Sequence, residues 1–452
     1  MASYFILASI SARTMSHYLK ENSFVDYDVI LSSDIAPRIS IIAPAFNESL
    51  TVVDSVRSLL TLQYNHFEVV VVNDGSTDDT FQLLQEAYQL KRIEYKIDKV
   101  FETEPILSAY RSTNTAYNKL LVVNKENGRK ADAANVGIMF AANPYILVVD
   151  VDGILSKDAL QILAKPFLEK SEDRRVIATG GVLRIANSCV VRGGRIVEVN
   201  PPDGFLPRMQ TIEYLRAFLL GRMAWFKLDG LLIISGAFGL FEKEIAIKAG
   251  GYNRKTVGED MEIVVRMRRY MLEQKQKYQV TFLPNPLCWT LAPETFKALG
   301  NQRRRWTRGT METLWLHRKM FFRPRYKLLG MLSMPYWGFL EYLSPLIEFL
   351  GILITISLLV LGLLNLKFVL LFLLFAYSFA VLYSVITLLT EEYTYHLYKK
   401  NSDFRKLLFV AFIDPIYFHL FIVYSAIRGN IEKIRGYSSW GVMEKKGFTR
   451  AS

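Results

Sequence analysis

The stretch Gln302-Arg303-Arg304-Arg305-Trp306 separates two kinds of sequence in this chain. Before it, apolar runs alternate with polar segments that contain carboxylates; after it, from about Leu328, the chain is mostly apolar. Arginine forks bind phosphate oxygens bidentately, and tryptophan prefers the interface between lipid and water. The stretch therefore favours a site for a phosphorylated ligand beside a membrane. A basic anchor at lipid headgroups would use the same residues, so this motif alone leaves both interpretations open.

The composition indicates a membrane and anionic partners. Hydrophobic residues make up 51% of the 452 residues, and the mean hydropathy of +0.17 is high for a soluble protein. The formal charge of +12 needs an anionic partner, and the apolar C-terminal third favours lipid headgroups and anionic substrates over nucleic acid. Cys189, Cys288 and the five histidines lack the spacing of metal ligands, so no zinc site is expected.

Residues 1–36 are predicted to be a lead-in that either lies at the membrane interface or is a truncated span. The apolar run from Tyr4 to Ile10 is much shorter than the roughly 20 residues that a span needs. Aromatic residues among charges in the rest of this segment fit a stretch that lies against a membrane. An ordinary surface helix fits them equally well.

Residues 37–320 are predicted to form an α/β domain. Short apolar runs that read as buried strands alternate with segments of helical periodicity, which implies a mostly parallel sheet covered on both faces. Ligands of such sheets bind beyond the carboxyl ends of the strands. The predicted strands are Ile39–Ala43, Glu68–Val72, Lys119–Val123 and Tyr145–Val149.

Polar motifs follow three of these strands. Pro44-Ala45-Phe46-Asn47-Glu48 follows the first strand, and Asp74 follows the second. Asp74 could contact a nucleoside, although Asn73-Asp74-Gly75 is also good turn chemistry. Asp150-Val151-Asp152 follows the fourth strand, and paired carboxylates there could hold a hard cation that bridges diphosphate oxygens and improves the leaving group.

Three further motifs could complete a site. Lys130 could meet a phosphate or be a surface lysine. The glycines of Ser235-Gly236-Ala237-Phe238-Gly239 would let the backbone approach a ligand closely, or would form a simple bulge. Gly258-Glu259-Asp260 opens a predicted helix, where Asp260 could deprotonate a hydroxyl or only favour the helix N-terminus. Cations for a diphosphate are expected from Arg303, Arg304, Arg305 and Arg308.

The remainder is predicted to be membrane-associated. We expect interfacial helices over residues 321–342, a transmembrane region over 343–428 and a basic cytoplasmic tail over 429–452. The positive-inside rule places the basic loop near Lys399 and the tail on the cytoplasmic side. Three full spans conflict with that placement unless one segment is re-entrant or the interfacial stretch crosses. The candidate spans are Leu343–Leu364, Phe368–Leu389 and Leu407–Ile427.

Taken together, the order and spacing of these motifs resemble the processive, membrane-embedded family 2 glycosyltransferases, such as poly-N-acetylglucosamine, hyaluronan and cellulose synthases. The resemblance covers roughly residues 37–427 and implies a GT-A fold, an α/β domain with a Rossmann-like sheet. It implies donor-nucleotide contacts at Pro44, Ala45, Asn47, Glu48, Asp74, Lys130 and Asp150, and a Mg²⁺ or Mn²⁺ ligand at Asp152. It implies the catalytic base motif at Glu259 and Asp260, and acceptor or diphosphate contacts at Ser235, Gly236, Phe238, Gly239, Gln302, Arg305 and Trp306.

The resemblance implies an inverting transferase that moves sugar from a UDP-sugar to a growing exopolysaccharide and is coupled to export. Its partners would be the UDP-sugar, a polysaccharide or lipid acceptor, membrane lipids and, as an open option, a small membrane subunit. We expect a multi-pass protein of a bacterial-type inner (plasma) membrane with the catalytic domain in the cytoplasm. One alternative is a non-processive transferase that glycosylates a membrane lipid. A non-catalytic export subunit is another, against which the complete set of carboxylates argues.

Overall fold

The computed structural model describes residues 2–169 and 173–436, which fall into two compact units. The sheet unit contains described residues 18–199 and 231–291, and the helical unit contains described residues 2–17, 200–230 and 292–436. Residues 200–230 and 292–320, which the sequence assigned to the α/β domain, therefore cluster with the C-terminal helices.

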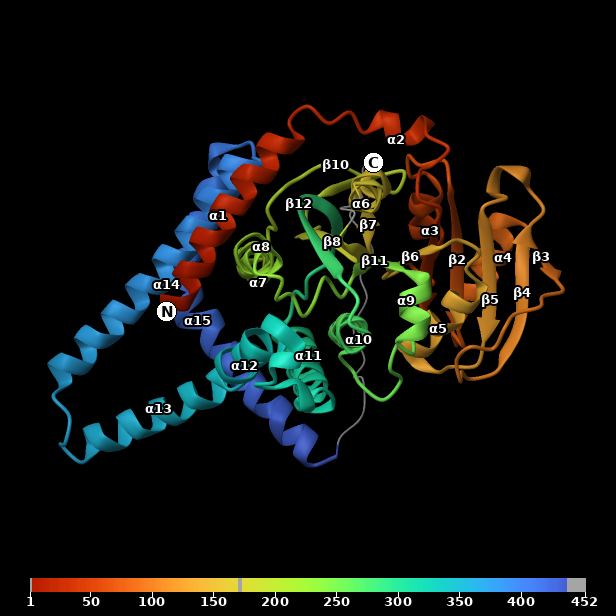
Figure 1. The fold of residues 1–452 in the computed structure, drawn as a ribbon. Helices are drawn as coiled ribbons and strands as arrows, with labels where there is room; N and C mark the ends of the chain where they lie inside the picture. Colours follow the sequence, from red (N-terminus) through yellow and green to blue (C-terminus); the bar gives the residue numbers. More distant parts are fainter. Residues whose placement is uncertain (1, 170–172, 437–452) are drawn as a thin grey trace. The chain divides into compact units, whose positions relative to one another are not determined.

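The sheet unit is built on one mixed sheet of ten strands (Figure 1). Its central strands β5, β2, β1 and β6 run parallel, as the sequence predicts. The antiparallel strand β11 then joins β6 to β8, and β8 pairs in parallel with β12. In sheet order the strands are β3 Leu90–Ile93, β4 Ile106–Ser112, β5 Leu120–Lys125, β2 Phe67–Asp74, β1 Ile39–Ala45, β6 Tyr145–Val149, β11 Phe238–Glu242, β8 Arg175–Ile185, β12 Tyr278–Thr290 and β7 Ile154–Leu155.

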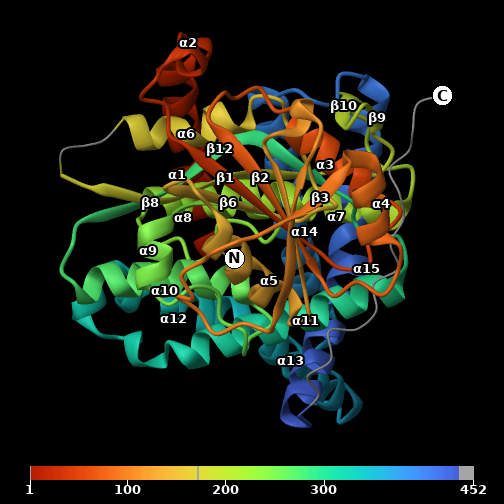
Figure 2. The same cartoon turned by 90° about the vertical axis from the view of Figure 1, so that its right-hand side faces the viewer.

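Helix α5 fixes the central part of this sheet, where Figure 2 shows β1, β2 and β6. Val70, Val72 and Val123 of the strands pack against Ala133 and Val136 of α5 in one buried cluster. The close approach of α5 to β1 depends on Gly137, where an added Cβ would lie 2.2 Å from Ile42 Cγ2. The helices of this unit are α2 Asp28–Ser32, α3 Val52–Leu60, α4 Thr80–Tyr88, α5 Arg129–Phe140, α6 Ala159–Leu168, α9 Lys243–Lys248 and α10 Glu259–Glu273.

The segment after β8, for which the sequence allowed a loop or a hairpin, is a hairpin. Strands β9, Val190–Arg192, and β10, Arg195–Glu198, pair antiparallel. Gly193 and Gly194 form the turn with φ of +57° and +76°, a backbone region that glycine adopts without strain.

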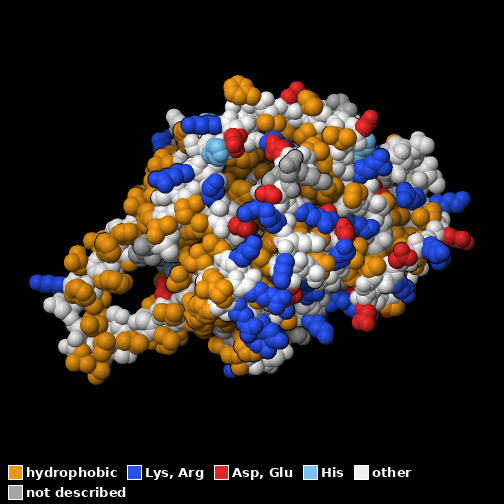
Figure 3. Space-filling view, viewed as in Figure 1, with side chains coloured by type: hydrophobic (Ala, Val, Ile, Leu, Met, Phe, Trp, Pro, Cys, Tyr) orange, Lys and Arg blue, Asp and Glu red, His pale blue; other side chains and the backbone are white. Residues whose placement is uncertain are grey.

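The helical unit contains three helices that are long and apolar enough to cross a membrane: 329–360, 366–394 and 401–434. They overlap the three predicted spans, although the first helix ends at 360, before the predicted end at Leu364. The stretch 329–342, predicted as interfacial, forms the start of that first helix. Hydrophobic side chains cover most of the visible surface of α13 and α14 (Figure 3). The main α-helices of this unit are α1 Ala2–Asn22 up to residue 17, α7 Phe205–Leu215, α8 Met223–Lys227, α11 Phe296–Leu316, α12 Met334–Tyr336, α13 Ser344–Val360, α14 Leu366–Thr394 and α15 Asn401–Ile434.

The N-terminal end of the chain is helical, and the predicted C-terminal tail falls only partly within the described residues. The lead-in is a regular helix, α1, whose Phe5 contacts Phe379 of α14 edge-on with ring centroids 5.4 Å apart. The predicted tail begins inside a helix, because α15 continues to Ile434. Residues 437–452, with the basic residues Lys445, Lys446 and Arg450, lie outside the described part of the chain.

An ion pair between half-buried Arg216 and buried Asp414 joins helices of the helical unit. Arg216 lies in a π-helical segment, Arg216–Arg222, and its guanidinium is 2.7 Å from Asp414 Oδ2 of α15. The same group donates a hydrogen bond to Ser384 Oγ of α14 at 2.9 Å. Charges within apolar helices are stable only when paired, so this contact explains how Asp414 is accommodated inside an apolar helix.

Candidate functional site

The first two sequence motifs meet at the carboxyl ends of β1 and β2. Asn47, with φ of +53°, accepts a hydrogen bond from Thr77 N–H at 2.8 Å, and its own N–H donates to Ser76 Oγ at 3.0 Å. Glu48 N–H donates to Thr80 Oγ1 at 2.7 Å. Pro44 and Ala45 complete β1 itself. The loop after β1 is therefore hydrogen-bonded to the loop that follows Asp74, although the two are about 30 residues apart in sequence.

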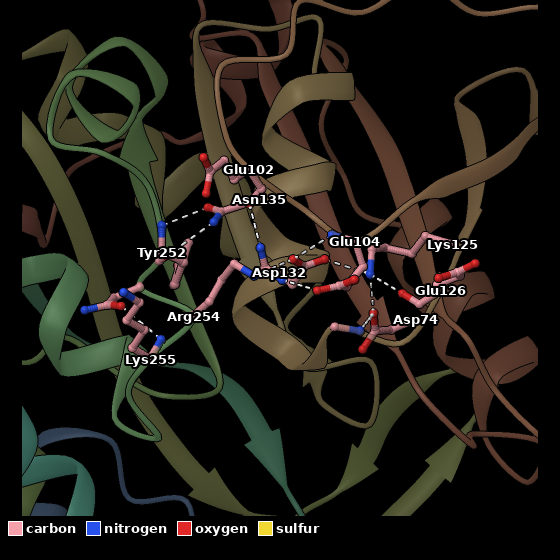
Figure 4. Close-up of polar contacts among 12 residues, drawn as sticks. Asp74, Glu102, Glu104, Lys125, Glu126, Asp132, Asn135, Tyr252, Arg254 and Lys255 are labelled. Atoms are coloured by element: carbon pink, nitrogen blue, oxygen red, sulfur yellow. Dashed lines mark hydrogen bonds and ion pairs between the residues drawn. The ribbon is translucent and has the colours of Figure 1, made fainter.

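Asp74 ends β2 and is buried in a chain of charges (Figure 4). Its Oδ1 accepts hydrogen bonds from Lys125 Nζ at 2.7 Å and from Gly128 N–H at 2.9 Å. Lys125 also lies 2.7 Å from Asp132 Oδ1, and Asp132 Oδ2 lies 2.7 Å from Arg254 Nε. Burial raises the pKa of the Asp74 carboxyl, while Lys125 and the N–H groups of Gly128 and Arg129 oppose the rise.

Lys130, Asp150 and Glu259 form a second charged group in the sheet unit. Lys130 Nζ pairs with Asp150 Oδ1, lies 3.8 Å from Glu259 Oε1 and donates to Gly236 O at 3.0 Å. Burial lowers the pKa of Lys130, but the carboxylates of Asp150 and Glu259 outweigh it and hold that pKa above its ordinary value. Lys130 is therefore not a plain surface lysine, and it stays protonated.

A small cavity brings the acceptor-loop and base motifs beside this group. Its lining includes Ser235, Gly236, Phe238 and Gly239 together with Lys130, Asp150, Glu259 and Asp260. The backbone holds the loop in place because Asp150 N–H donates to Ala237 O at 2.8 Å. The structure thus gathers four of the predicted motifs, which are spread along the sequence from Lys130 to Asp260, around one space.

Asp260 lies in the first turn of α10, where its Oδ1 accepts a hydrogen bond from Met261 N–H at 2.9 Å. The electrostatic interpretation is thus partly right, since the carboxylate does lie at a helix N-terminus. Its other oxygen faces Gly236 so closely that an added Cβ there would lie 2.5 Å from it. The glycine therefore makes room for the carboxylate inside the cavity.

Asp150 and Asp152 follow β6 in the position that suits a hard cation. Carboxylate oxygens are the donors that Mg²⁺ and Mn²⁺ prefer. Within residues 2–169 and 173–436 no group of three or more His, Cys, Asp or Glu side chains forms a candidate metal site. The donor set fits an ion that takes one or two carboxylates and completes its shell with substrate phosphates and water.

Sequence reasoning missed three residues near these motifs. Lys125 ends β5 and so obeys the same strand-end rule that identified Asp74. Asn135 clamps the loop before α10, accepting from Tyr252 N–H at 2.8 Å and donating to Tyr252 O at 2.9 Å. Arg254 follows in that loop and had no local signal, because its partners lie over 120 residues away.

Gln302, Arg305 and Trp306 lie on α11 in the helical unit. The structure assigns Arg303 to Glu213, with both fork contacts at 2.6 Å, and Arg304 to Glu432 at 3.0 Å. Both arginines that the sequence offered to a diphosphate therefore have carboxylate partners within the helical unit. Arg303 also lies over the Trp306 ring, 4.3 Å from its centroid, and 40% of the tryptophan surface is exposed.

Comparison with solved structures shows the fold. A mannosyltransferase from Pyrobaculum calidifontis, solved in complex with GDP-Man and Mn²⁺, superposes with a TM-score of 0.51 at 15% identity. The match covers 97% of this chain and 99% of that one. The predicted GT-A class of α/β fold, followed by long apolar helices, is confirmed.

Comparison with sequences shows the relatives. Poly-beta-1,6-N-acetyl-D-glucosamine synthases of Staphylococcus aureus and Staphylococcus epidermidis are 28% identical to this chain over 320 and 315 residues. The matches cover 70% of this chain and 64% of those proteins. Residues 253–425 match the chitin synthase family. Residues 37–309 match the family described as glycosyltransferase like family 2. Since that match covers more than half of the chain, the protein belongs to glycosyltransferase family 2.

Proposed function

We propose that the protein transfers sugar from a UDP-sugar to a growing polysaccharide, with inversion at the anomeric carbon, and feeds the product into the membrane. The cavity that joins Asp260 to Lys130 and Asp150 carries this proposal. A candidate base lies there beside a cation and the strand-end carboxylate of Asp150, and this arrangement supports a transfer in which a diphosphate leaves. The likeness to poly-N-acetylglucosamine synthases makes UDP-N-acetylglucosamine the first donor to test.

The reaction begins at Asp260. Its carboxylate accepts the proton of an acceptor hydroxyl, and the oxygen attacks the anomeric carbon of the donor. The bond between that carbon and the diphosphate oxygen breaks, and UDP leaves with the electron pair. Attack opposite to the leaving group inverts the configuration. Gly236 and the Ser235–Gly239 loop keep the base in place, because the glycine accommodates its carboxylate.

The leaving diphosphate needs positive charge. Asp152, with Asp150 beside it, would hold Mg²⁺ or Mn²⁺, which when bound neutralises the diphosphate and makes UDP a better leaving group. Lys130 supplies a permanent cation next to Asp150. We assign Arg305 to the diphosphate, and Gln302 and Trp306 to the acceptor, by the family resemblance of the Gln-x-x-Arg-Trp motif. Asp74, Asn47 and Glu48 are assigned to the nucleoside for the same reason.

The same proposal covers location and partners. Three helices in the described part of the chain are long and apolar enough to span a bilayer. Nucleotide sugars are made in the cytoplasm, so we place the catalytic part on the cytoplasmic side of the plasma membrane. Multi-pass topology and a small membrane partner subunit belong to this proposal.

The test is an assay of the full chain in lipid nanodiscs with a panel of UDP-sugars. UDP release and product size on a gel are measured for the wild type and for Asp260→Asn. We expect polymer from one donor, and a loss of about 10²–10⁴-fold in transfer rate for the variant with little change in UDP affinity. A singly glycosylated lipid from every donor, even with native membrane partners present, would replace the polymerase assignment with the lipid transferase.

A further inference from the structure

The charge chain Asp74–Lys125–Asp132–Arg254, shown in Figure 4, contains one residue, Lys125, that has no role in the proposed mechanism. Lys125 is completely buried and lies between two carboxylates, Asp74 and Asp132, each 2.7 Å from its Nζ. A buried lysine pair of this kind is weak evidence for stability, because the desolvation of the ions offsets their attraction. Its position next to the proposed nucleoside contact suggests a role in binding.

We propose that Lys125 is a specificity-determining residue that holds Asp74 as an ionised hydrogen-bond acceptor, so that the site selects uracil over cytosine. The proposal rests on the proposed use of a UDP-sugar and deepens it. Lys125 acts through Asp74 and is therefore a positioning residue rather than a catalytic one.

The geometry supports a fixed acceptor. Lys125 Nζ and Gly128 N–H both donate to the same oxygen, Oδ1 of Asp74. An ionised carboxylate has about four lone-pair sites, so it can accept these bonds and one more from a ligand. Asn127 Nδ2 also donates to the backbone carbonyl of Asp74 at 2.8 Å, which fixes the main chain beneath the side chain.

The rest of the chain keeps Lys125 in place. Asp132 is fully buried and joins Lys125 to Arg254, and Arg254 pairs further with Glu104. Positive and negative groups alternate along this chain, so each buried charge has an opposite neighbour. Removal of Lys125 would leave Asp74 buried without its cation, whereas Asp132 would keep Arg254. A buried carboxylate without a cation takes up a proton.

Protonation of Asp74 would change which base the site prefers, because uracil and cytosine have different hydrogen-bonding groups. Uracil presents an N–H donor at its ring position 3, which matches an ionised carboxylate. Cytosine presents a lone pair at the same position, which an ionised carboxylate repels and a protonated carboxyl group can satisfy. A site built around one hydrogen-bond pattern rejects the opposite pattern strongly, because buried polar groups are left unpaired.

The experiment measures UDP and CDP affinity by titration calorimetry on the full-length protein in detergent, with Mg²⁺ present. The variants are Lys125→Met, Asp74→Asn and, as the matched control, Asp132→Asn. The control removes the other carboxylate from Lys125 but keeps the contact between Lys125 and Asp74. We expect Lys125→Met to reduce the preference for UDP over CDP by about tenfold or more, and Asp132→Asn to change it by less than about threefold. Asp74→Asn should also relax the preference, because an amide can both donate and accept.

Several results would overturn the proposal. The proposal is wrong if Lys125→Met keeps the wild-type preference for UDP over CDP. It is also wrong if Asp132→Asn loses as much of that preference as Lys125→Met, since the network would then have only a structural role. An unchanged preference in Asp74→Asn would remove Asp74 from the base contact. A wild type without UDP preference would overturn the proposed donor as well. Thermal melting verifies that each variant folds. If Lys125→Met does not fold, Lys125→Gln replaces it, because glutamine keeps a hydrogen-bond donor without the charge. Lys125→Gln should also reduce the preference for UDP over CDP.

Discussion

The substitution Gly236→Ala tests whether the cavity around Asp260 is catalytic. A Cβ at this position would lie 2.5 Å from Asp260 Oδ2. An ordinary contact between carbon and oxygen is about 3.3 Å, so the carboxylate or the loop must move by about 0.8 Å. A misplacement of roughly 1 Å can cost about 10²-fold in rate. We therefore expect kcat for transfer to fall by about 10–100-fold, within the limit that loss of the base itself sets.

The assay compares sugar transfer with UDP affinity in the same preparation. UDP affinity should change little, because the methyl group disturbs the base and not the nucleoside contacts. Gly351→Ala serves as the matched control, since no atom beyond the backbone of its own helix and its chain neighbours lies within 4 Å of an added Cβ there, and it should keep the wild-type rate. Equal losses in both variants would show a general sensitivity to glycine replacement.

A double-mutant cycle then tests whether Gly236 acts through Asp260. If it does, Gly236→Ala should add almost nothing to the loss already caused by Asp260→Asn, because residues that work as a unit are not additive. Two losses that multiply in the double variant would refute the reasoning, and so would a Gly236→Ala enzyme with the full wild-type rate. In either case the close contact would be a packing detail without catalytic meaning.

Three further changes test other parts of the proposal. Asp152→Asn should nearly abolish turnover stimulated by Mg²⁺ or Mn²⁺, because a carboxylate ligand is lost; a metal titration checks this, and full wild-type activity in excess EDTA contradicts it. Trp306→Ala should shorten the polymer on a gel more than it slows donor hydrolysis, since the half-exposed ring is assigned to the acceptor; an unchanged length distribution rules that assignment out. Glu213→Gln should destabilise the helical unit by about 1.5–3 kcal/mol, because a charge-assisted fork contact to buried Arg303 is lost; a thermal midpoint equal to that of the wild type argues against it.

Much of the site could be predicted from the sequence because its signals are local. A valine-rich run is a buried strand wherever it lies, and polar residues directly after parallel strands share one edge of the sheet. These rules were enough to place Asp74 at the end of β2 and Asp150 at the end of β6. Long apolar runs likewise identified the three helices that can cross a membrane, because span length follows from bilayer thickness alone.

Tertiary structure decided which charges pair. The arginines of Gln302–Trp306 look alike in sequence, yet Arg303 is bound by Glu213, a residue 90 positions earlier. Lys125 and Arg254 belong to one charge chain through Asp132, although Arg254 has no local signal and the strand-end position of Lys125 does not identify its partners. The partners of a buried charge depend on which strands and helices the fold brings together. The hydrophobic periodicity of the sequence does not contain that information.

Tertiary structure also decided the division of the chain and the order of the sheet. Residues 200–230 and 292–320 have the composition of the α/β part but pack with the apolar helices. Strand β11 runs antiparallel between β6 and β8, so the loop before it, with Gly236, lies beside the end of β6, where Asp150 N–H bonds to Ala237 O. The sequence by itself determined the elements and the residue types of the site. Their meeting around one cavity depends on the antiparallel placement of β11, because strand direction is set by long-range pairing and not by local pattern.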